Sequence, residues 1–342
     1  MAKVVTLGEI MLRLSPPGYE RFAQASRFDV NYGGAEANVA ASLAQLGNNA
    51  AFLSKIPANA IGDAAIATLK SLGINCQYIA RGGKRLGIYF LENGASIRPS
   101  SVVYDRADSS VTQAKATEFD FDKIFNDVDL FHVSGITPVL SQDAADLTLA
   151  ALKKAKEHGV TVSFDLNYRA KLWTDHIEEK QQMLSDMMPY VDICFGNARD
   201  AAKCLGYTEN GIDFINGDYN ICVDETHMTN VMKRYGFTHL ITTLRNSISA
   251  SDNGWSGAIC TDSGLYHGRT YDLHIVDRVG GGDAFAAGVL HGILAEMGDE
   301  KALEFGLAAA AIKHTIPGDL NFISAEEVLN LMNTDGAGRV QR

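Results

Sequence analysis

Residues 277–288 read Asp277-Arg278-Val279-Gly280-Gly281-Gly282-Asp283-Ala284-Phe285-Ala286-Ala287-Gly288, which places three glycines and a carboxylate at the start of an apolar helical run. The first turn of a helix has unpaired N–H groups and the positive end of the helix dipole, and glycine lets a phosphate approach that backbone closely. A carboxylate beside such donors is the minimum equipment of a small-molecule kinase. The stretch therefore predicts an anion site at Gly280, Gly281 and Gly282, with Asp283 as the general base.

An alternative interpretation is that the three glycines form only a tight turn and that Asp283 caps the helix. Two other nucleotide motifs are excluded. The chain contains no G-x-x-x-x-G-K-[ST] sequence, and the glycine cluster lacks the G-x-G-x-x-G spacing of a dinucleotide fold. An NAD-linked enzyme is therefore the weakest rival.

The composition is that of an ordinary globular protein. The chain has 342 residues, of which 46% are hydrophobic and 21% charged, and a formal net charge of -11. This charge argues against nucleic-acid and anionic-membrane partners. The five cysteines are odd in number and never form C-x-x-C, which favours reduced thiols in a cytoplasmic location. The sequence begins with a predicted strand rather than a signal peptide, and no apolar run approaches the roughly 20 residues that span a bilayer.

Apolar, β-branched runs alternate with helical patterns from residue 120 onward, which predicts β-α units and a mostly parallel sheet. Four of these runs end in polar residues, and such strand ends form the edge where open α/β sheets bind ligands. The four runs and their endings are Leu130–Val133 before Ser134-Gly135, Val160–Phe164 before Asp165–Arg169, Val191–Phe195 before Gly196–Asp200, and His239–Leu244 before Arg245–Ser247.

Two early segments, residues 10–32 and about 83–112, lack helical periodicity and predict a small β-sheet lid inserted in the main domain. Asn93-Gly94 indicates a hairpin whose second strand is Ile97–Tyr104. Alternate residues of a strand share a face, so Tyr104 and Arg106 are expected to point the same way.

We expect one domain over residues 1–330 and a C-terminal tail over 331–342, which contains Gly336-Ala337-Gly338. Residues 207–227 are rich in Asn, Gly and Asp and predict a surface loop of unknown purpose.

Two signatures resemble the PfkB family of sugar kinases. Residues 277–283 are similar to the family's D-T-x-G-A-G-D, with Arg278 and Gly281 as departures, and Gly33–Ala40 matches the N-terminal signature. The resemblance extends over residues 3–330. It implies a ribokinase-like fold, a three-layer α/β/α sandwich, and ATP with Mg²⁺ as cofactors.

Within that family, several stretches resemble 2-keto-3-deoxygluconate kinases. A sugar acid carries a carboxylate that a neutral sugar lacks, and arginine can hold a carboxylate with two parallel hydrogen bonds. Arg106 in the lid and Arg169 at a strand end are the candidates. The alternatives are a surface salt bridge for Arg106 and a sheet-edge ion pair for Arg169. The stretches are Asn31–Asn38, Tyr89, Tyr104–Ala107, Asp165–Arg169 with Leu172-Trp173, and Lys313–Asp319.

Four further residues are expected at the sugar. Tyr89 and Tyr104 would provide aromatic walls and hydroxyls, unless they only pack the lid onto the main domain or onto a partner's lid. Gly34 permits close approach of the backbone, and Asn38 offers an amide one helical turn later.

The nucleotide side is carried over from the resemblance. Asn197 and Asp200 stand where the family has N-x-x-E, and the shorter carboxylate favours a water-mediated contact with Mg²⁺. Arg245 is expected near a phosphate or in solvent, and His314 and Asn321 near the adenine. The family also implies a monovalent cation such as K⁺, held largely by backbone oxygens near the C-terminal signature.

The sequence thus predicts an ATP-dependent kinase that phosphorylates 2-keto-3-deoxygluconate at its 6-hydroxyl, with Gly280 and Gly282 contacting ATP. The alternatives are a kinase for fructose, ribose, 5-keto-2-deoxygluconate or 2-keto-3-deoxygalactonate, and a sugar-binding regulator without catalysis. The apolar residues and free edges of the lid predict a homo-oligomer, most simply a dimer through the lid.

Overall fold

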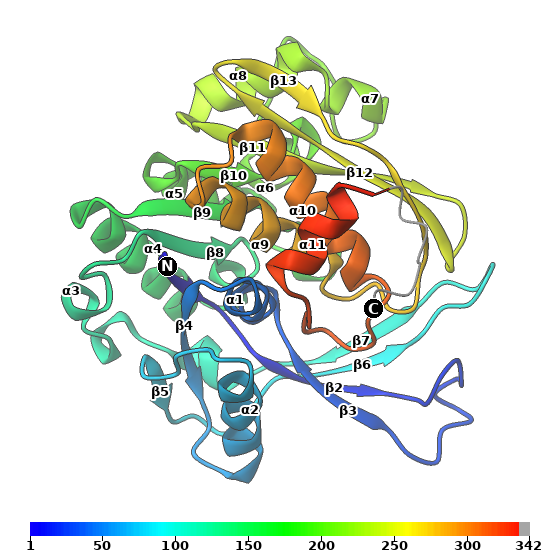
Figure 1. Cartoon of the computed structure of the whole chain (residues 1–342). Helices are drawn as coiled ribbons and strands as arrows, with labels where there is room; N and C mark the ends of the chain where they lie inside the picture. Colours follow the sequence, from blue (N-terminus) through cyan, green and yellow to red (C-terminus); the bar gives the residue numbers. More distant parts are fainter. Residues whose placement is uncertain (335–342) are drawn as a thin grey trace.

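The centre of the molecule is a ten-stranded sheet, within the residues 1–334 that this computed structural model describes (Figure 1). The strand order is β13-β12-β11-β10-β9-β8-β1-β4-β5, and β14 pairs with β12. Strands β11 through β5 in this order are parallel, whereas β12 to β14 pair in antiparallel fashion. The strands are β1 Lys3–Leu7, β4 Asn49–Ile56, β5 Ile79–Arg81, β8 Leu130–Ser134, β9 Thr161–Asp165, β10 Ile193–Phe195, β11 His239–Ser247, β12 Asp252–Thr261, β13 Gly264–His267 and β14 Tyr271–His274.

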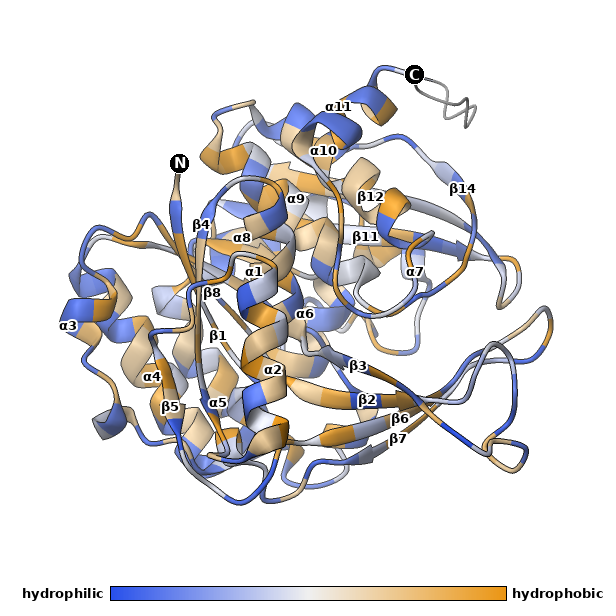
Figure 2. Cartoon of the chain, turned by 60° about the horizontal axis from the view of Figure 1, so that its bottom comes forward, coloured by the Kyte–Doolittle hydropathy of each residue, from blue (hydrophilic) through white to orange (hydrophobic). Residues whose placement is uncertain are grey.

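Helices cover both faces of this sheet, so each face has a hydrophobic core (Figure 2). Successive side chains of a strand point to opposite faces. Phe131 and Val133 of β8 accordingly enter one core, whereas Leu130 enters the other. The first core is closed by α3 Phe121–Ile124, α4 Gln142–Glu157, α5 Ile177–Met187, α6 Ala198–Leu205 and α8 Glu225–Tyr235, and the second by α1 Ala35–Gln45, α2 Ala60–Ser71, α9 Gly281–Leu294 and α10 Asp299–Lys313, with α11 Ala325–Met332 packed on α10. The predicted three-layer α/β/α sandwich is confirmed.

A separate four-stranded sheet, here called the lid, projects from the body as predicted (Figures 1 and 2). Its inner face is buried and carries Met11, Arg13 and Tyr89. Its outer face is apolar but open, with Val30 57% and Val103 50% exposed. The lid strands are β3 Asp29–Gly33, β2 Met11–Ser15, β6 Ile88–Glu92 and β7 Ser101–Asp105, in that spatial order.

The predicted hairpin exists, but its turn does not lie at Asn93-Gly94. β7 begins only at Ser101, and the chain reverses where Ala95 pairs with Arg98. Ser96, inside this reversal, has a φ of 51°. The hairpin connection is therefore a long loop rather than a two-residue turn, and Ile97 lies outside the strand.

Two other boundaries differ from the expectation. β11 continues past Leu244 to Ser247 because it pairs with β12, so Arg245 lies within a strand, opposite Trp255. Residues 207–227 are more than a surface loop: they contain helix α7, Tyr219–Cys222, and the buried side chain of Phe214.

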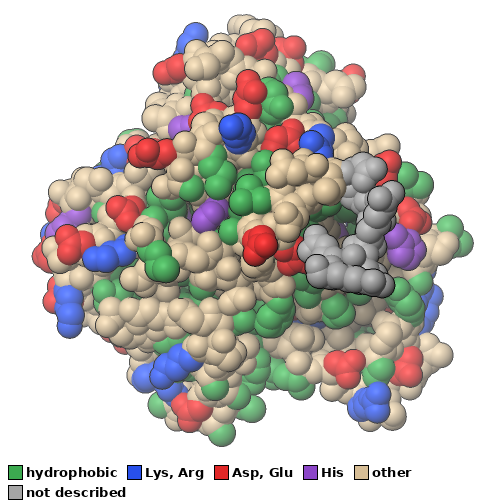
Figure 3. Space-filling model, viewed as in Figure 1, with side chains coloured by type: hydrophobic (Ala, Val, Ile, Leu, Met, Phe, Trp, Pro, Cys, Tyr) green, Lys and Arg blue, Asp and Glu red, His purple; other side chains and the backbone are tan. Residues whose placement is uncertain are grey.

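The surface in Figure 3 shows acidic and basic side chains interspersed, without a patch of one sign on the visible face. No helix within residues 1–334 is long and apolar enough to cross a bilayer. Most of the predicted tail, including Gly336-Ala337-Gly338, lies outside the described residues.

Candidate active site

A cavity of about 450 Å³ lies between the lid and the carboxyl ends of the central strands. It brings together most of the residues predicted from the sequence, and they come from the lid, the strand ends and the start of α9. The predicted residues that line it are Gly34, Asn38, Tyr89, Tyr104, Arg106, Arg169, Asp200, Arg245, Gly280, Gly282 and Asp283, whereas Asn197, Gly281, His314 and Asn321 do not.

The glycine turn has a different steric demand at each position. Gly280 has a φ of 81° and precedes α9, and a Cβ there would lie 2.1 Å from the carbonyl oxygen of Asp319. A Cβ on Gly281 would lie 2.4 Å from the His314 ring, whereas one on Gly282 would meet nothing within 4 Å. The first two glycines therefore permit tight packing behind the turn, and the third leaves open space. In the first turn of α9, the N–H of Gly281 donates to the carbonyl of Arg278 at 3.3 Å. The N–H groups of Gly282 and Asp283 have no partner among the described residues, so they can donate to an anion such as a nucleotide phosphate.

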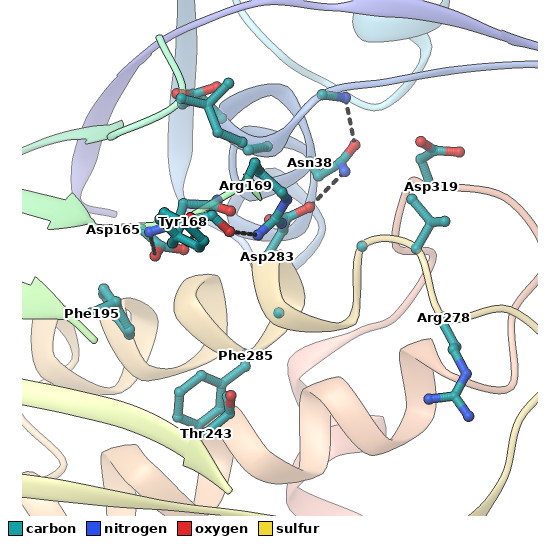
Figure 4. Close-up of a pocket in the computed structure, with 18 of the residues that line it drawn as sticks. Asn38, Asp165, Tyr168, Arg169, Phe195, Thr243, Arg278, Asp283, Phe285 and Asp319 are labelled. Carbon is teal, nitrogen blue, oxygen red and sulfur yellow. Dashed lines mark hydrogen bonds between the residues drawn. The ribbon is translucent and has the colours of Figure 1, made fainter. Parts of the chain in front are cut away.

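Asp283 lies in the first turn of α9 and is held by a neighbouring helix. Asn38 of α1 donates its amide to Asp283 at 2.7 Å, and its own oxygen accepts from the N–H of Gly34 at 3.2 Å (Figure 4). Burial raises the pKa of Asp283 to about 6, while the Asn38 bond and the charge of Arg169 oppose that rise. A fixed carboxylate with such a pKa is suited to accepting a proton near neutral pH.

Two more carboxylates share the cavity, and the sequence had not marked the first of them for a role. Burial raises the pKa of Asp165 to about 7, and the charge of Asp283 adds to this rise. Burial also raises the pKa of Asp200. No three acidic, histidine or cysteine side chains within residues 1–334 converge on one point. The crowded carboxylates nevertheless fit Mg²⁺, because this ion uses one or two protein carboxylates together with waters and substrate phosphates.

Asn197 has a structural position behind this cluster. Its side-chain oxygen caps α6 by accepting from Arg199 and Asp200, and its amide nitrogen donates to Thr242 at 3.1 Å and to Tyr219 at 3.2 Å. Both ends of the amide are thus engaged by the protein, and the predicted contact of Asn197 with metal or nucleotide stays a prediction.

Three arginines line the cavity without a carboxylate ion-pair partner among the described residues. Arg169 donates only to the carbonyl of Tyr168, at 3.1 Å, and its side chain lies beside Asp283 in Figure 4. Arg278 donates to the main chain of the loop after β11, and Arg245 lies over the Trp255 ring at 5.3 Å. Guanidinium groups without acidic partners are available for an anionic ligand.

Arg106 and Tyr89 are instead attached to the body. Arg106 forms an ion pair with Glu9, and its Nε is buried without a partner. The Tyr89 hydroxyl donates to the carboxylate of Asp319. The ion pair expected as the alternative for Arg106 is therefore present, although it is buried rather than on the surface. Tyr104 is 39% exposed and packs against Tyr89, with ring centroids 6.0 Å apart.

His314 and Asn321 were expected at the adenine but do not reach the cavity. The His314 ring packs on Trp255 at 4.7 Å and bonds to the carbonyl of Ala310. Asn321 is 1% exposed, and its amide has no hydrogen-bond partner. The His314 ring lies behind the glycine turn, against Gly281, and the contact of either residue with adenine stays a prediction.

The sequence did not predict the buried ion pairs of Arg13, which lie behind the cavity lining. Arg13 of β2 donates to Asp277 at 2.7 Å and to Asp319 at 2.9 Å, and it is 2% exposed. The only available signal was a charged residue in an otherwise apolar strand, because burial of an arginine requires acidic partners.

Comparison with known proteins defines the family. The model of the pfkB family carbohydrate kinases matches residues 1–325. The chain belongs to this family. A 2-dehydro-3-deoxygalactonokinase from Haloferax volcanii is 34% identical over 98% of both chains. A 2-dehydro-3-deoxygluconokinase from Bacillus subtilis is 28% identical over 95% of this chain and 93% of its own.

Solved structures agree with this assignment. The crystal structure of the 2-dehydro-3-deoxygluconokinase from Thermotoga maritima has 48% identity and a TM-score of 0.91, and the match covers 98% of this chain and all of the other. The present protein is accordingly a pfkB sugar kinase, a phosphotransferase.

In this pfkB kinase, the carboxyl group of Asp283 should titrate near pH 6, and Asn38→Ala should raise that pKa further, because the amide of Asn38 stabilises the ionised form. The measurement is a pH titration of ¹³C-labelled aspartate carboxyl groups, with Asp283→Asn for assignment. Asp122, whose pKa is lowered by His158 and Lys154, provides the internal control. A pKa for Asp283 at or below the ordinary 3.8 would contradict the expectation.

Proposed function

We propose that this pfkB kinase transfers the γ-phosphoryl group of ATP to the 6-hydroxyl of 2-keto-3-deoxygluconate or its galacto epimer. The observation that carries the proposal is the position of Arg169. It lines the same cavity as Asp283, and its guanidinium forms no ion pair within residues 1–334. A sugar bound there can place its carboxylate on arginine and its hydroxyl near Asp283. The names of the Haloferax, Bacillus and Thermotoga relatives support the same substrate class.

In the proposed reaction, Asp283 accepts the proton of the sugar hydroxyl. The hydroxyl oxygen then forms a bond to the γ-phosphorus as the bond to the ADP oxygen breaks. The N–H groups of Gly280 and Gly282 donate to the phosphate oxygens as their charge develops, whereas the N–H of Gly281 donates to the carbonyl of Arg278 at 3.3 Å. Mg²⁺, placed through Asp200 and water, supplies further neutralisation when bound. Asn38 keeps Asp283 oriented toward the sugar.

Asp283→Asn should lower kcat by about 10² to 10⁴, the usual contribution of general-base assistance, while ATP affinity stays close to that of the wild type. ADP release gives kcat, and calorimetry gives the affinity for ATP. The exposed Asp122→Asn is the matched control and should leave both unchanged. Activity of Asp283→Asn within about fivefold of wild type would exclude Asp283 as the base, because the assistance expected is larger.

Arg169→Ala should weaken use of a sugar acid by about 10- to 100-fold in kcat/KM, since a charged hydrogen bond contributes about 1.5 to 3 kcal/mol. Side activity on a neutral sugar should change much less. The measurement is ADP release with 2-keto-3-deoxygluconate, its galacto epimer, 5-keto-2-deoxygluconate, fructose and ribose.

The same screen decides between the proposed substrate and its rivals. A preference of the wild type for fructose or ribose would favour the neutral-sugar kinase, and no turnover with any sugar would favour the non-catalytic regulator. Arg106→Ala serves as the comparison. Arg106 forms a buried ion pair with Glu9, so removing it also leaves the Glu9 charge unpaired. The thermal stability of Arg106→Ala should therefore fall more than that of Arg169→Ala.

We further propose that the lid joins two copies of the chain through its outer face. This face carries Val30, Phe90 and Val103 side by side, as the pairings of β2, β3, β6 and β7 require. An apolar sheet face of this kind is stabilised by covering it. Asp105 lies at the edge of this apolar face and forms an ion pair with Arg85.

Val30→Glu combined with Val103→Glu should therefore shift the protein toward monomer, because two charges would be buried in the contact. Sedimentation velocity measures the change. Ile61→Glu, an exposed apolar position on α2 rather than on the lid, is the control. A double variant that sediments like the wild type would exclude the outer face as the contact.

A further inference from the structure

Lys313 is a buried lysine outside the cavity. It is the last residue of α10, with 0% of its surface exposed. Its Nζ donates to the carbonyl oxygens of Ile316 at 3.0 Å and Gly318 at 2.8 Å. Burial lowers the pKa of Lys313, and the charges of Asp277 and Asp319 oppose this. An ammonium taken out of water requires such compensation, so its position is specific.

The loop that Lys313 holds is bonded to the anion site. The N–H of Gly318 donates to Asp277 Oδ2 at 2.9 Å, and the N–H of Val279 donates to Asp277 Oδ1 at 3.0 Å. A Cβ on Gly280 would lie 3.2 Å from Cε of Lys313. The lysine, the 316–319 loop and the glycine turn are therefore in direct contact.

This arrangement does not fit the free monovalent cation implied by the family resemblance. Such an ion would take backbone oxygens near the C-terminal signature. Here two backbone oxygens beside Asp277 point at one ammonium group, which already supplies the positive charge. Oxygens that accept from Nζ are not free to surround another ion at the same point.

We propose that the ammonium of Lys313 serves as a built-in monovalent cation, which holds the 316–319 loop against the anion site so that the kinase requires no free K⁺. Lys313 is thus a positioning residue: it touches neither sugar nor nucleotide and acts through the loop and Gly280. This role is independent of which sugar is phosphorylated.

The test compares choline, Na⁺ and K⁺ chlorides at constant ionic strength, by ADP release and by thermal unfolding. Wild-type kcat should change by less than about twofold, since no ion enters the site. Lys313→Ala should lose at least about tenfold in choline and regain activity with K⁺ or methylammonium, because it leaves a space lined by carbonyl oxygens. Lys313→Met fills that space with an apolar chain, so it should lose activity without being rescued.

Unfolding gives a readout that does not depend on finding the sugar. K⁺ should raise the Tm of Lys313→Ala, but not that of the wild type or of Lys313→Met. Lys55→Ala is the matched control, because Lys55 also donates to a main-chain carbonyl and a carboxylate, and it lies outside the cavity. It should show no rescue.

Three results would overturn the proposal. They are a wild type whose activity or Tm depends on K⁺, a Lys313→Ala variant that is fully active in choline, and an equal response of Lys55→Ala to K⁺. If Lys313→Ala does not fold, the wild type and Lys313→Met still decide, since dependence of the wild type on K⁺ suffices to exclude a built-in cation.

Discussion

A buried ion-pair cluster fixes the lid to the glycine turn at the start of α9. Arg13 of the lid donates to Asp277 and Asp319, and all three side chains are at most 5% exposed. Asp277 in turn binds the N–H groups of Val279 and Gly318 on both sides of the glycine turn. Removing one member of such a cluster leaves an uncompensated charge, at a cost of about 3 to 5 kcal/mol. The lid and the glycine turn therefore share one set of charges.

The cavity contains both acidic and basic side chains. Carboxylates with raised pKa values, Asp165, Asp200 and Asp283, lie at the strand ends and the start of α9. Guanidinium groups without acidic partners among the described residues line the same cavity, at Arg169 and Arg245. Each group is set before a ligand arrives, so little reorganisation is needed during the reaction.

Features that depend on a few neighbouring residues could be predicted from the sequence. Strand ends, the glycine turn and the lid segments leave periodic or steric signals within a few residues, and the structure brings the predicted Asp283, Asn38 and Arg169 together. Contacts between distant segments leave no such signal. Arg13 and Asp319 are 306 positions apart, and neither stands in a motif that predicts the other. His314 and Asn321 do not line the cavity, and their expected place at the adenine stays a prediction.

The connection between the lid and Asp283 constrains how this enzyme can evolve. β3 runs through Gly33 and Gly34 directly into α1, which carries Asn38 and thereby the orientation of Asp283. A change in β3 therefore alters the position of Asn38 and, through it, of Asp283. The β6–β7 hairpin does not run directly into α1. It meets the body through Tyr89 on Asp319, through Lys171, which donates to the carbonyl of Val102, and through Ser96, whose N–H donates to Ser251. The two halves of the lid therefore differ in how a substitution reaches the cavity: β3 transmits it to Asn38 and Asp283 through the main chain of α1, whereas the hairpin transmits it through its contacts with the body.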